Sequence, residues 1–372
     1  MQLGLNIGYW SRRQDLVDVL ALTREAEQLG FAVCWVAEAY GSDAATTLAW
    51  LASQTSRIGL GSGVFQIPAR SPAMTAMTAA SLDALSGGRF RLGLGVSGPQ
   101  VSEGWHGVRF AKPLARTREY VGVVRTALAG KPVTASGEHY PLPLPGGAGK
   151  ALRLAFHPVR TQVPIYLAAI GPANLRLTGE IADGWLAIFF SPDHATGWLA
   201  EIAGGQASSP SRQPPTPQPP TPAESSERDS APDQPAGFDV NASVPLVVGD
   251  DLDACADPVR HYFALYIGGM GSRDQNFYNQ LARRMGFDQA ADEIQARYLE
   301  KEHRKAAAAV PPDLIDQTSL LGTTDRIADR LRAFAEAGVT TLSVTPFAGA
   351  LDDRVAALRT VCEALDRAGV GD

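Results

Sequence analysis

Short apolar runs alternate with amphipathic segments along most of the chain. Leu3–Ile7 and Phe31–Ala37 are runs typical of buried strands, and Asp15–Leu29 between them carries apolar side chains on one helical face before Gly30. The same order recurs further along the chain. Further strands are predicted at Ile58–Phe65, Phe90–Val96, Pro164–Ile170, Trp185–Phe190, Asp239–Val248 and Thr340–Val344, and further helices at Ser42–Ser56, Pro72–Leu85, Leu114–Leu128, Pro172–Ala182, Asp193–Ala203, Asp253–Gly268 and Thr323–Ala337.

This alternation predicts an α/β fold in which eight strands are each followed by a helix, which is the order of a (β/α)8 TIM barrel. An open, doubly wound parallel sheet has the same alternation but usually fewer strands. We therefore expect residues 1–372 to form a single barrel domain with insertions, and the extra helices at 270–310 could act as a lid. In such a barrel the functional side chains lie at the C-terminal ends of the strands.

Residues 205–238 interrupt this pattern. Nine prolines fall between positions 210 and 235, and the segment shows no apolar periodicity. Such a chain buries too little apolar surface to offset the entropy of ordering it. We expect a disordered surface insertion, with a proline-rich recognition motif as the alternative.

Charge and composition narrow the class of protein. The 372 residues carry a net charge of −6, and no long run of Lys or Arg occurs, which argues against nucleic acid or an anionic membrane as the main partner. Cys34, Cys255 and Cys362 are far apart, so a disulfide framework or a cysteine zinc site is not expected. The first residues lack the pattern of a signal peptide, and no run of 18 apolar residues occurs. We expect a cytoplasmic enzyme.

Glycines cluster at the ends of several predicted strands. Gly93–Gly98 has the GxGxxG spacing of a dinucleotide-binding turn, but a predicted loop from Pro99 to Gly107 follows it instead of a helix. Ile58–Val64 carries three glycines, which indicates a bulge, the close approach of a ligand to the backbone, or tight packing inside a barrel. Gly171 joins a strand to a helix N-terminus, where free amides suit a phosphate, although Gly-Pro is also an ordinary turn.

Three titratable groups are candidates for general acid–base chemistry. Glu38 directly follows an apolar strand, where a carboxylate needs a partner or a function. Glu103 and His106 lie together after the fourth strand, although a lone histidine is more often structural than catalytic. The sequence contains no HExxH, GxSxG or Walker A motif, so hydrolase and phosphoryl-transfer functions lack support and no metal site is predicted.

Several blocks of the sequence, in the same order, resemble the bacterial luciferase-like superfamily. Within it, the chain is most similar to the deazaflavin-dependent oxidoreductases, the branch of methylenetetrahydromethanopterin reductase and of the actinobacterial glucose-6-phosphate dehydrogenase. The resemblance covers nearly the whole chain outside the proline-rich segment. The blocks are Gly30–Glu38, Thr47–Ala52, Ile58–Val64, Arg70–Ala76, Ser81–Phe90, Leu92–Gly95, Val163–Pro172 and Gly179–Trp185.

The resemblance implies a luciferase-like barrel, usually a homodimer, that binds coenzyme F-420 (an 8-hydroxy-5-deazaflavin) and transfers a hydride to or from a small organic substrate. It implies a non-prolyl cis peptide within Ser62-Gly63-Val64 behind the deazaflavin ring, and a phosphate contact at the amides around Gly171. The side chains of Trp10, Phe65, Trp105 and Phe189 could shape the pocket, or could belong to the core. Tyr40 is a further candidate for an acid–base or cofactor-contacting group, after Glu38, Glu103 and His106. The implied cofactor-contacting residues are Glu38, Ala39, Ser62, Gly63, Val64, Gly95, Ser97, Ser102, Ala169, Ile170, Gly171 and Pro172.

Two departures from the family pattern bear on the substrate. Relatives often carry an Asp-His pair where this chain has Glu38-Ala39, and the glucose-6-phosphate enzyme has a catalytic glutamate where this chain has Pro99. These differences argue against glucose 6-phosphate and leave the proton donor unassigned. Two alternatives stay open: an FMN-dependent monooxygenase that uses reduced flavin and O2, and a flavin-binding protein without catalytic activity.

Overall fold

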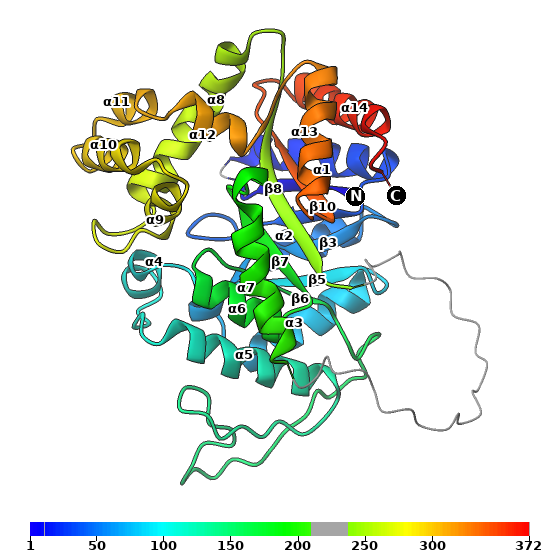
Figure 1. Ribbon diagram of the computed structural model, residues 1–372. Helices are drawn as coiled ribbons and strands as arrows, with labels where there is room; N and C mark the ends of the chain where they lie inside the picture. Colours follow the sequence, from blue (N-terminus) through cyan, green and yellow to red (C-terminus); the bar gives the residue numbers. More distant parts are fainter. Residues whose placement is uncertain (11, 210–236, 372) are drawn as a thin grey trace.

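The computed structural model describes residues 1–10, 12–209 and 237–371, and in these residues eight parallel strands close into the predicted barrel (Figure 1). The order around the barrel is β1, β2, β3, β5, β6, β7, β8 and β10, and β10 pairs with both β8 and β1. The strands are β1 (Gln2–Gly8), β2 (Val33–Val36), β3 (Gly59–Ser62), β4 (Phe65–Gln66), β5 (Phe90–Gly95), β6 (Ile165–Ala168), β7 (Gly184–Ile188), β8 (Asp239–Val248), β9 (Leu320–Gly322) and β10 (Thr341–Pro346).

Helices cover the outside of this ring, as expected for strands that are apolar on both faces. They are α1 (Arg13–Gln28), α2 (Ala44–Ala52), α3 (Pro72–Leu85), α4 (Pro99–Gly104), α5 (Pro113–Leu128), α6 (Pro172–Ile181), α7 (Ala195–Ala207), α8 (Leu252–Ala264), α9 (Phe277–Arg284), α10 (Asp288–Leu299), α11 (His303–Ala308), α12 (Pro312–Gln317), α13 (Thr324–Glu336) and α14 (Leu351–Ala368). A π-helical turn, η4 (Leu265–Gly269), extends α8. No helix among the described residues is long and apolar enough to cross a bilayer.

Two predictions about local structure were wrong. The third strand is not continuous from Ile58 to Phe65, because β3 ends at Ser62 and β4 begins only at Phe65. The segment after Gly98 is not a simple loop, because α4 begins at Pro99. Extended Gly98 at the N-cap and proline at the first helical position favour a helix start, but six residues are too few to show helical periodicity.

The proline-rich insertion is shorter at its N-terminal side than predicted. Helix α7 continues to Ala207, so residues 205–207 are helical. The nine prolines fall within residues 210–236, which lie outside the described residues. The insertion itself therefore stays a prediction.

Helices α8 to α12 lie beside the barrel (Figure 1). Their buried apolar side chains form a second core. The predicted extra helices at 270–310 are present as α9, α10 and α11. They pack against η4 and α8, so they are fixed to the segment that follows β8. Phe189, just after β7, joins this second core and connects it to the barrel. Their action as a lid stays a prediction.

Candidate active site

A non-prolyl cis peptide bond joins Gly63 to Val64 at the carboxyl end of β3, which confirms the prediction for this position. The chain resumes its pairing with β5 only at β4. Just before the cis bond, Oγ of Ser62 donates to the carbonyl oxygen of Gly93 at 2.8 Å and accepts from the amide of Gly93 at 2.9 Å. Both bonds are buried, so they hold β3 against β5 where the strand breaks and form a bulge at the barrel mouth.

The glycines around this bulge are required by close packing. A Cβ on Gly61 would lie 2.3 Å from the ring of Trp35, which occupies the barrel interior. A Cβ on Gly95 would lie 2.6 Å from Cγ2 of Val64. Tight packing, one of the explanations offered for the glycine-rich third strand, therefore accounts for Gly61. The close approach of a flat ligand stays a prediction.

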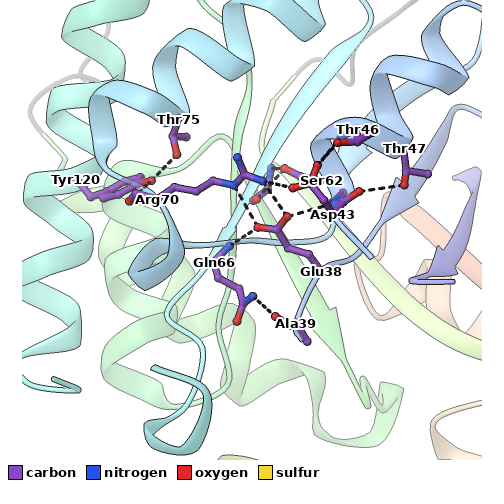
Figure 2. Close-up of polar contacts among 12 residues, drawn as sticks. Glu38, Ala39, Asp43, Thr46, Thr47, Ser62, Gln66, Arg70, Thr75 and Tyr120 are labelled. Atoms are coloured by element: carbon purple, nitrogen blue, oxygen red, sulfur yellow. Dashed lines mark hydrogen bonds and ion pairs between the residues drawn. The ribbon is translucent and has the colours of Figure 1, made fainter. Parts of the chain in front are cut away.

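Glu38 lies just beyond β2 with its carboxylate directed at Arg70 (Figure 2). The guanidinium of Arg70 donates to the two carboxylate oxygens at 3.3 and 3.1 Å, and the amides of Ala44 and Gln66 donate at 3.2 and 3.4 Å. The side chain of Glu38 is only 8% exposed. An ionised carboxylate offers about four acceptor sites, and four donors occupy them here. This arrangement suits a carboxylate that fixes neighbouring loops.

Arg70 also binds Asp43, the N-cap residue of α2, with Nη2 2.6 Å from Oδ1. Burial disfavours the charge of Arg70, but the hydrogen bonds and attraction from Glu38 and Asp43 outweigh it and raise the pKa of Arg70. Burial also disfavours the charge of Asp43, but hydrogen bonds from Thr46 and the nearby Arg70 outweigh it and lower the pKa of Asp43. Glu38, Arg70 and Asp43 therefore form a fixed charged cluster at the mouth.

Gln66 binds the backbone next to Glu38 (Figure 2) and also reaches the end of β5. Its Nε2 donates to the carbonyl oxygen of Ala39 at 2.8 Å, and its Oε1 accepts from Oγ of Ser97 at 3.0 Å. Ser97 follows β5 and has a positive φ of 61°. The structure thus gathers seven of the predicted cofactor-contacting residues around one bulge. They are Glu38, Ala39, Ser62, Gly63, Val64, Gly95 and Ser97.

Helix α4 and the turn after it carry three more predicted residues. Ser102 is 2% exposed and donates to the carbonyl oxygen of Val108 at 2.6 Å. The carboxylate of Glu103 accepts from the amide of Phe110 at 2.9 Å. Both side chains therefore hold their own loop together. His106 differs, because its buried Nε2 has no partner among the described residues.

A cleft of about 580 Å³ lies beside the charged cluster. Glu38 and Arg70 line one part of it, and Trp105 and His106, from the turn after α4, line another. Two of the three predicted catalytic groups, Glu38 and His106, therefore border the same cleft.

The remaining predicted residues lie at the end of β6. Gly171 is the N-cap of α6, and an added Cβ there would meet nothing within 4 Å, so the first free amide, that of Ala173, is approachable. Pro172 occupies the first helical position and has no N–H. Nη2 of Arg284, on α9, donates to the carbonyl oxygen of Ile170 at 3.2 Å. A helix N-terminus beside a guanidinium suits an anion.

Sequence reasoning missed Arg284. It lies 114 residues from Ile170 in the chain, and only its position in an extra helix could have drawn attention to it. Ala169, beside this site, is 3% exposed, and its carbonyl oxygen accepts from Nε1 of Trp185 at 2.9 Å. Ala169 therefore supports the strand end through buried contacts.

Of the predicted pocket aromatics, Phe65, Trp10 and Phe189 make internal contacts, whereas Trp105 is exposed at the cleft. Phe65 is fully buried and packs on Phe90, so it belongs to the core. Trp10 donates from Nε1 to Oγ1 of Thr47 at 3.0 Å and thereby ties the segment after β1 to α2. Trp105 is 67% exposed at the cleft, and Phe189 is the centre of an aromatic cluster.

The comparisons with known proteins agree with this geometry. The family model described as luciferase-like monooxygenase matches residues 5–341. A protein of Mycobacterium tuberculosis, named as a coenzyme F-420-dependent oxidoreductase, is 42% identical over 353 residues, which cover 93% of this chain and 95% of the relative. The 5,10-methylenetetrahydromethanopterin reductase of Archaeoglobus fulgidus is 29% identical over 321 residues, 85% of each chain.

A solved structure supports the same fold. The coenzyme F-420-dependent tetrahydromethanopterin reductase of Methanopyrus kandleri superposes with a TM-score of 0.76 at 23% identity, covering 98% of this chain and 97% of that one. At this identity the likeness concerns the fold alone. Since the family model spans most of the sequence and a relative is 42% identical over nearly its whole length, this chain belongs to the luciferase-like monooxygenase family.

Proposed function

We propose that the chain is a coenzyme F-420-dependent oxidoreductase that transfers a hydride between the deazaflavin and a small organic substrate. The observation that carries the proposal is the 42% identity, over 93% of this chain, with a protein named as such an enzyme. The direction of transfer and the substrate are not specified by that likeness. The geometry of the barrel mouth supports the same assignment.

Two features of the mouth fit a flat cofactor with an anionic tail. At the bulge, half-buried Gly63 and Val64 offer a small apolar surface between the ends of β2 and β5. At the end of β6, the approachable amide of Ala173 and the guanidinium of Arg284 offer donors for a phosphate. When bound, the cofactor supplies the redox-active carbon, while the protein supplies orientation and a dry pocket.

In this proposal most of the chain's own site residues position the loops and the bulge, and His106 borders the cleft. Glu38 and Glu103 accept hydrogen bonds from backbone amides, so we assign them to positioning. Gln66 and Arg70 hold the loops around the bulge. His106 is the predicted group whose imidazole borders the cleft. Ser62 fixes the bulge from the core side through Gly93.

Titration of the purified protein with coenzyme F-420 and with FMN tests this proposal. We expect F-420 to bind at least about ten times more tightly than FMN, a difference of about 1.4 kcal/mol. Quenching of the cofactor's own fluorescence measures both affinities. Preferred binding of FMN, with consumption of O2 when reduced flavin is supplied, would favour the monooxygenase alternative. Tight F-420 binding without turnover by any acceptor would favour a non-catalytic binding protein.

We further propose that the protein is a cytoplasmic homodimer. Met74 and Met77, on α3, are about half exposed, and Trp105, which lines the same cleft as Met74, is 67% exposed. Exposed apolar side chains of this size are typical of an interface. Sedimentation velocity distinguishes a monomer of 39.4 kDa from a dimer. The Met74→Glu variant is expected to shift the equilibrium towards monomer.

A further inference from the structure

Three tyrosines gather above the barrel mouth around Phe189. Tyr262, Tyr266 and Tyr278 come from α8, η4 and α9, and their rings lie 5.7, 5.6 and 6.2 Å from the ring of Phe189. Phe347, just after β10, closes the group with its ring 5.4 Å from that of Tyr262. Strand ends β7 and β10 therefore meet the extra helices in one aromatic surface, which we call the tyrosine wall.

The tyrosine wall faces the ends of β1 and β2. Electrostatic influence on Tyr266 comes from Tyr9 and Tyr40, which follow those two strands and are 40% and 55% exposed. Tyr9 packs against Gly41, where a Cβ would lie 2.5 Å from its ring, so the two loops are held together. Phe189 and Phe347 follow β7 and β10, which lie across the ring of strands from β3 and β5, so the wall lies opposite the strand ends that carry the bulge.

The wall is polar only through uncharged phenols. Burial, with Tyr9 and Tyr40 nearby, raises the pKa of Tyr266 to about 12, although a hydrogen bond with Tyr262 acts in the opposite direction. Burial also raises the pKa values of Tyr262 and Tyr278, and the other influences on them are again tyrosines. Each hydroxyl therefore keeps its proton at neutral pH. Tyr262 and Tyr266 are also within hydrogen-bonding reach of each other.

The surroundings of the wall disfavour a charged ligand. The charged cluster of Glu38, Arg70 and Asp43 is internally paired, and Arg284 binds the end of β6. The ring contacts of the three wall tyrosines are with one another and with Phe189, Phe263 and Phe347. A charge brought against these rings would lose its hydration without gaining an opposite charge.

We propose that the tyrosine wall binds an uncharged, ring-containing substrate with a carbonyl-type oxygen, and that the hydroxyl of Tyr266 donates a hydrogen bond to that oxygen. This inference rests on the proposed function, because it places the substrate opposite the bulge. Aromatic rings provide flat apolar contact, and a phenol provides a donor without a charge. Tyr266 is the wall tyrosine that interacts with Tyr40, and Tyr40 lines the cleft, so we assign the donor to Tyr266.

The hydroxyl of Tyr266 can also supply the proton that reduction of a carbonyl needs. Reduction of a carbonyl forms one C–H bond from the hydride, which the reduced deazaflavin provides, and one O–H bond on the former carbonyl oxygen. The O–H bond of Tyr266 breaks as the new O–H bond forms, and the phenolate recovers a proton from solvent. An alkoxide is a much stronger base than a phenolate, so a phenol of raised pKa is still acidic enough to donate.

Binding of acetophenone and benzoate, which share a ring but differ in charge, tests the proposal. Saturation-transfer NMR on the full-length protein, with and without F-420, measures both. We expect acetophenone to bind at least about tenfold more tightly than benzoate, and Tyr266→Phe to weaken acetophenone binding about fivefold, which is the loss of one neutral hydrogen bond. Tyr140→Phe, which alters a half-buried phenol packed on Tyr120, is the matched control and should change nothing.

The experiment tests ligand binding at the tyrosine wall independently of F-420 binding. Equal binding of benzoate, no binding of acetophenone, or an unchanged affinity in Tyr266→Phe would overturn the proposal. F-420 affinity, measured in the same samples by fluorescence, should be the same for wild type and Tyr266→Phe. If the wild-type protein does not bind F-420, the proposed function is wrong. Acetophenone binding would still test the tyrosine wall in that case. Circular dichroism and thermal unfolding confirm that Tyr266→Phe is folded.

Discussion

Glu38 and Arg70 join the end of β2 to the segment after β4 through hydrogen bonds of 3.1 and 3.3 Å. The two side chains are 8% and 15% exposed, so the pair is largely removed from water. Arg70 also stacks over the ring of Phe65, with the guanidinium carbon 4.7 Å from the ring centroid. Because the bulge at Gly63–Val64 lies between the two strand ends that this pair connects, its position depends on the pair.

We expect Glu38→Gln to lower the free energy of unfolding by about 3 kcal/mol, because it leaves Arg70 as a partly buried charge with one fewer partner. Arg70→Met should have a similar cost, and the double variant should cost less than the sum. Urea unfolding measures all three stabilities. F-420 affinity should fall in parallel, since both residues support the bulge.

The same variants separate positioning from catalysis. If Glu38 were the proton donor, Glu38→Gln would remove turnover while leaving stability and F-420 affinity unchanged. Arg70→Met would then leave the chemical step largely intact. A positioning pair requires both variants to behave alike.

Two glycine variants test the packing around the bulge. A Cβ on Gly93 would lie 2.0 Å from the carbonyl oxygen of Ser62, which belongs to the backbone and cannot move aside easily. We expect Gly93→Ala to destabilise the protein by about 3 kcal/mol or more. Gly171→Ala is the matched control, because its Cβ would meet nothing within 4 Å and its φ of −85° is open to alanine. Thermal unfolding checks both, and equal stabilities would contradict the clash.

Much of the barrel could be predicted because each strand–helix unit carries its own periodicity. Asp239–Val248 and Pro72–Leu85 have the bounds expected from their apolar patterns and caps. The break after Ser62 could not be derived from the residues alone, because glycines in a strand fit packing and a bulge equally well. Only the family resemblance pointed to Gly63–Val64.

The hydrogen-bond partners of the site residues could not be predicted from sequence patterns. Glu38 was recognised as a carboxylate at a strand end, but nothing local indicates that Arg70, 32 residues away, occupies it. Arg284 meets Ile170 only because the extra helices fold back over the mouth. Helix α4 was missed because six residues show no periodicity. Contacts of this kind depend on tertiary structure and not on local propensity.

We expect Arg284 to contribute to binding of the anionic part of the cofactor. We expect Arg284→Met to weaken F-420 binding about tenfold, because a charge-assisted hydrogen bond is lost, and to reduce the salt dependence of binding. Fluorescence titration at two ionic strengths measures both effects. Arg283→Met is the control, since Arg283 donates to Asn279 and pairs with Asp292 on the surface. Equal loss in the two variants would indicate a general effect of charge.

Glu27 provides a test of pH dependence away from the site. One oxygen, Oε1, accepts from the amides of Ser56, Arg57 and Ile58 at 2.8, 2.7 and 3.1 Å. Burial opposes the charge, but these three hydrogen bonds, with Arg89 nearby, outweigh it and lower the pKa of Glu27 below the ordinary 4.5. A carboxyl whose folded pKa is depressed stabilises the protein above its unfolded pKa, and this contribution is lost as the pH falls through the folded value.

We therefore expect Glu27→Gln to be less stable than wild type by about 1–2 kcal/mol at pH 7, and the gap to narrow as the pH falls below about 4.5. Urea unfolding between pH 7 and pH 3 measures the gap. Glu363→Gln is the control, because Glu363 is exposed and, among the described residues, pairs only with Arg367 on the same helix. The difference in unfolding free energy between Glu363→Gln and wild type should stay small at every pH. A Glu27→Gln gap that is constant from pH 7 to pH 3 would mean that the three amides do not favour the ionised carboxylate.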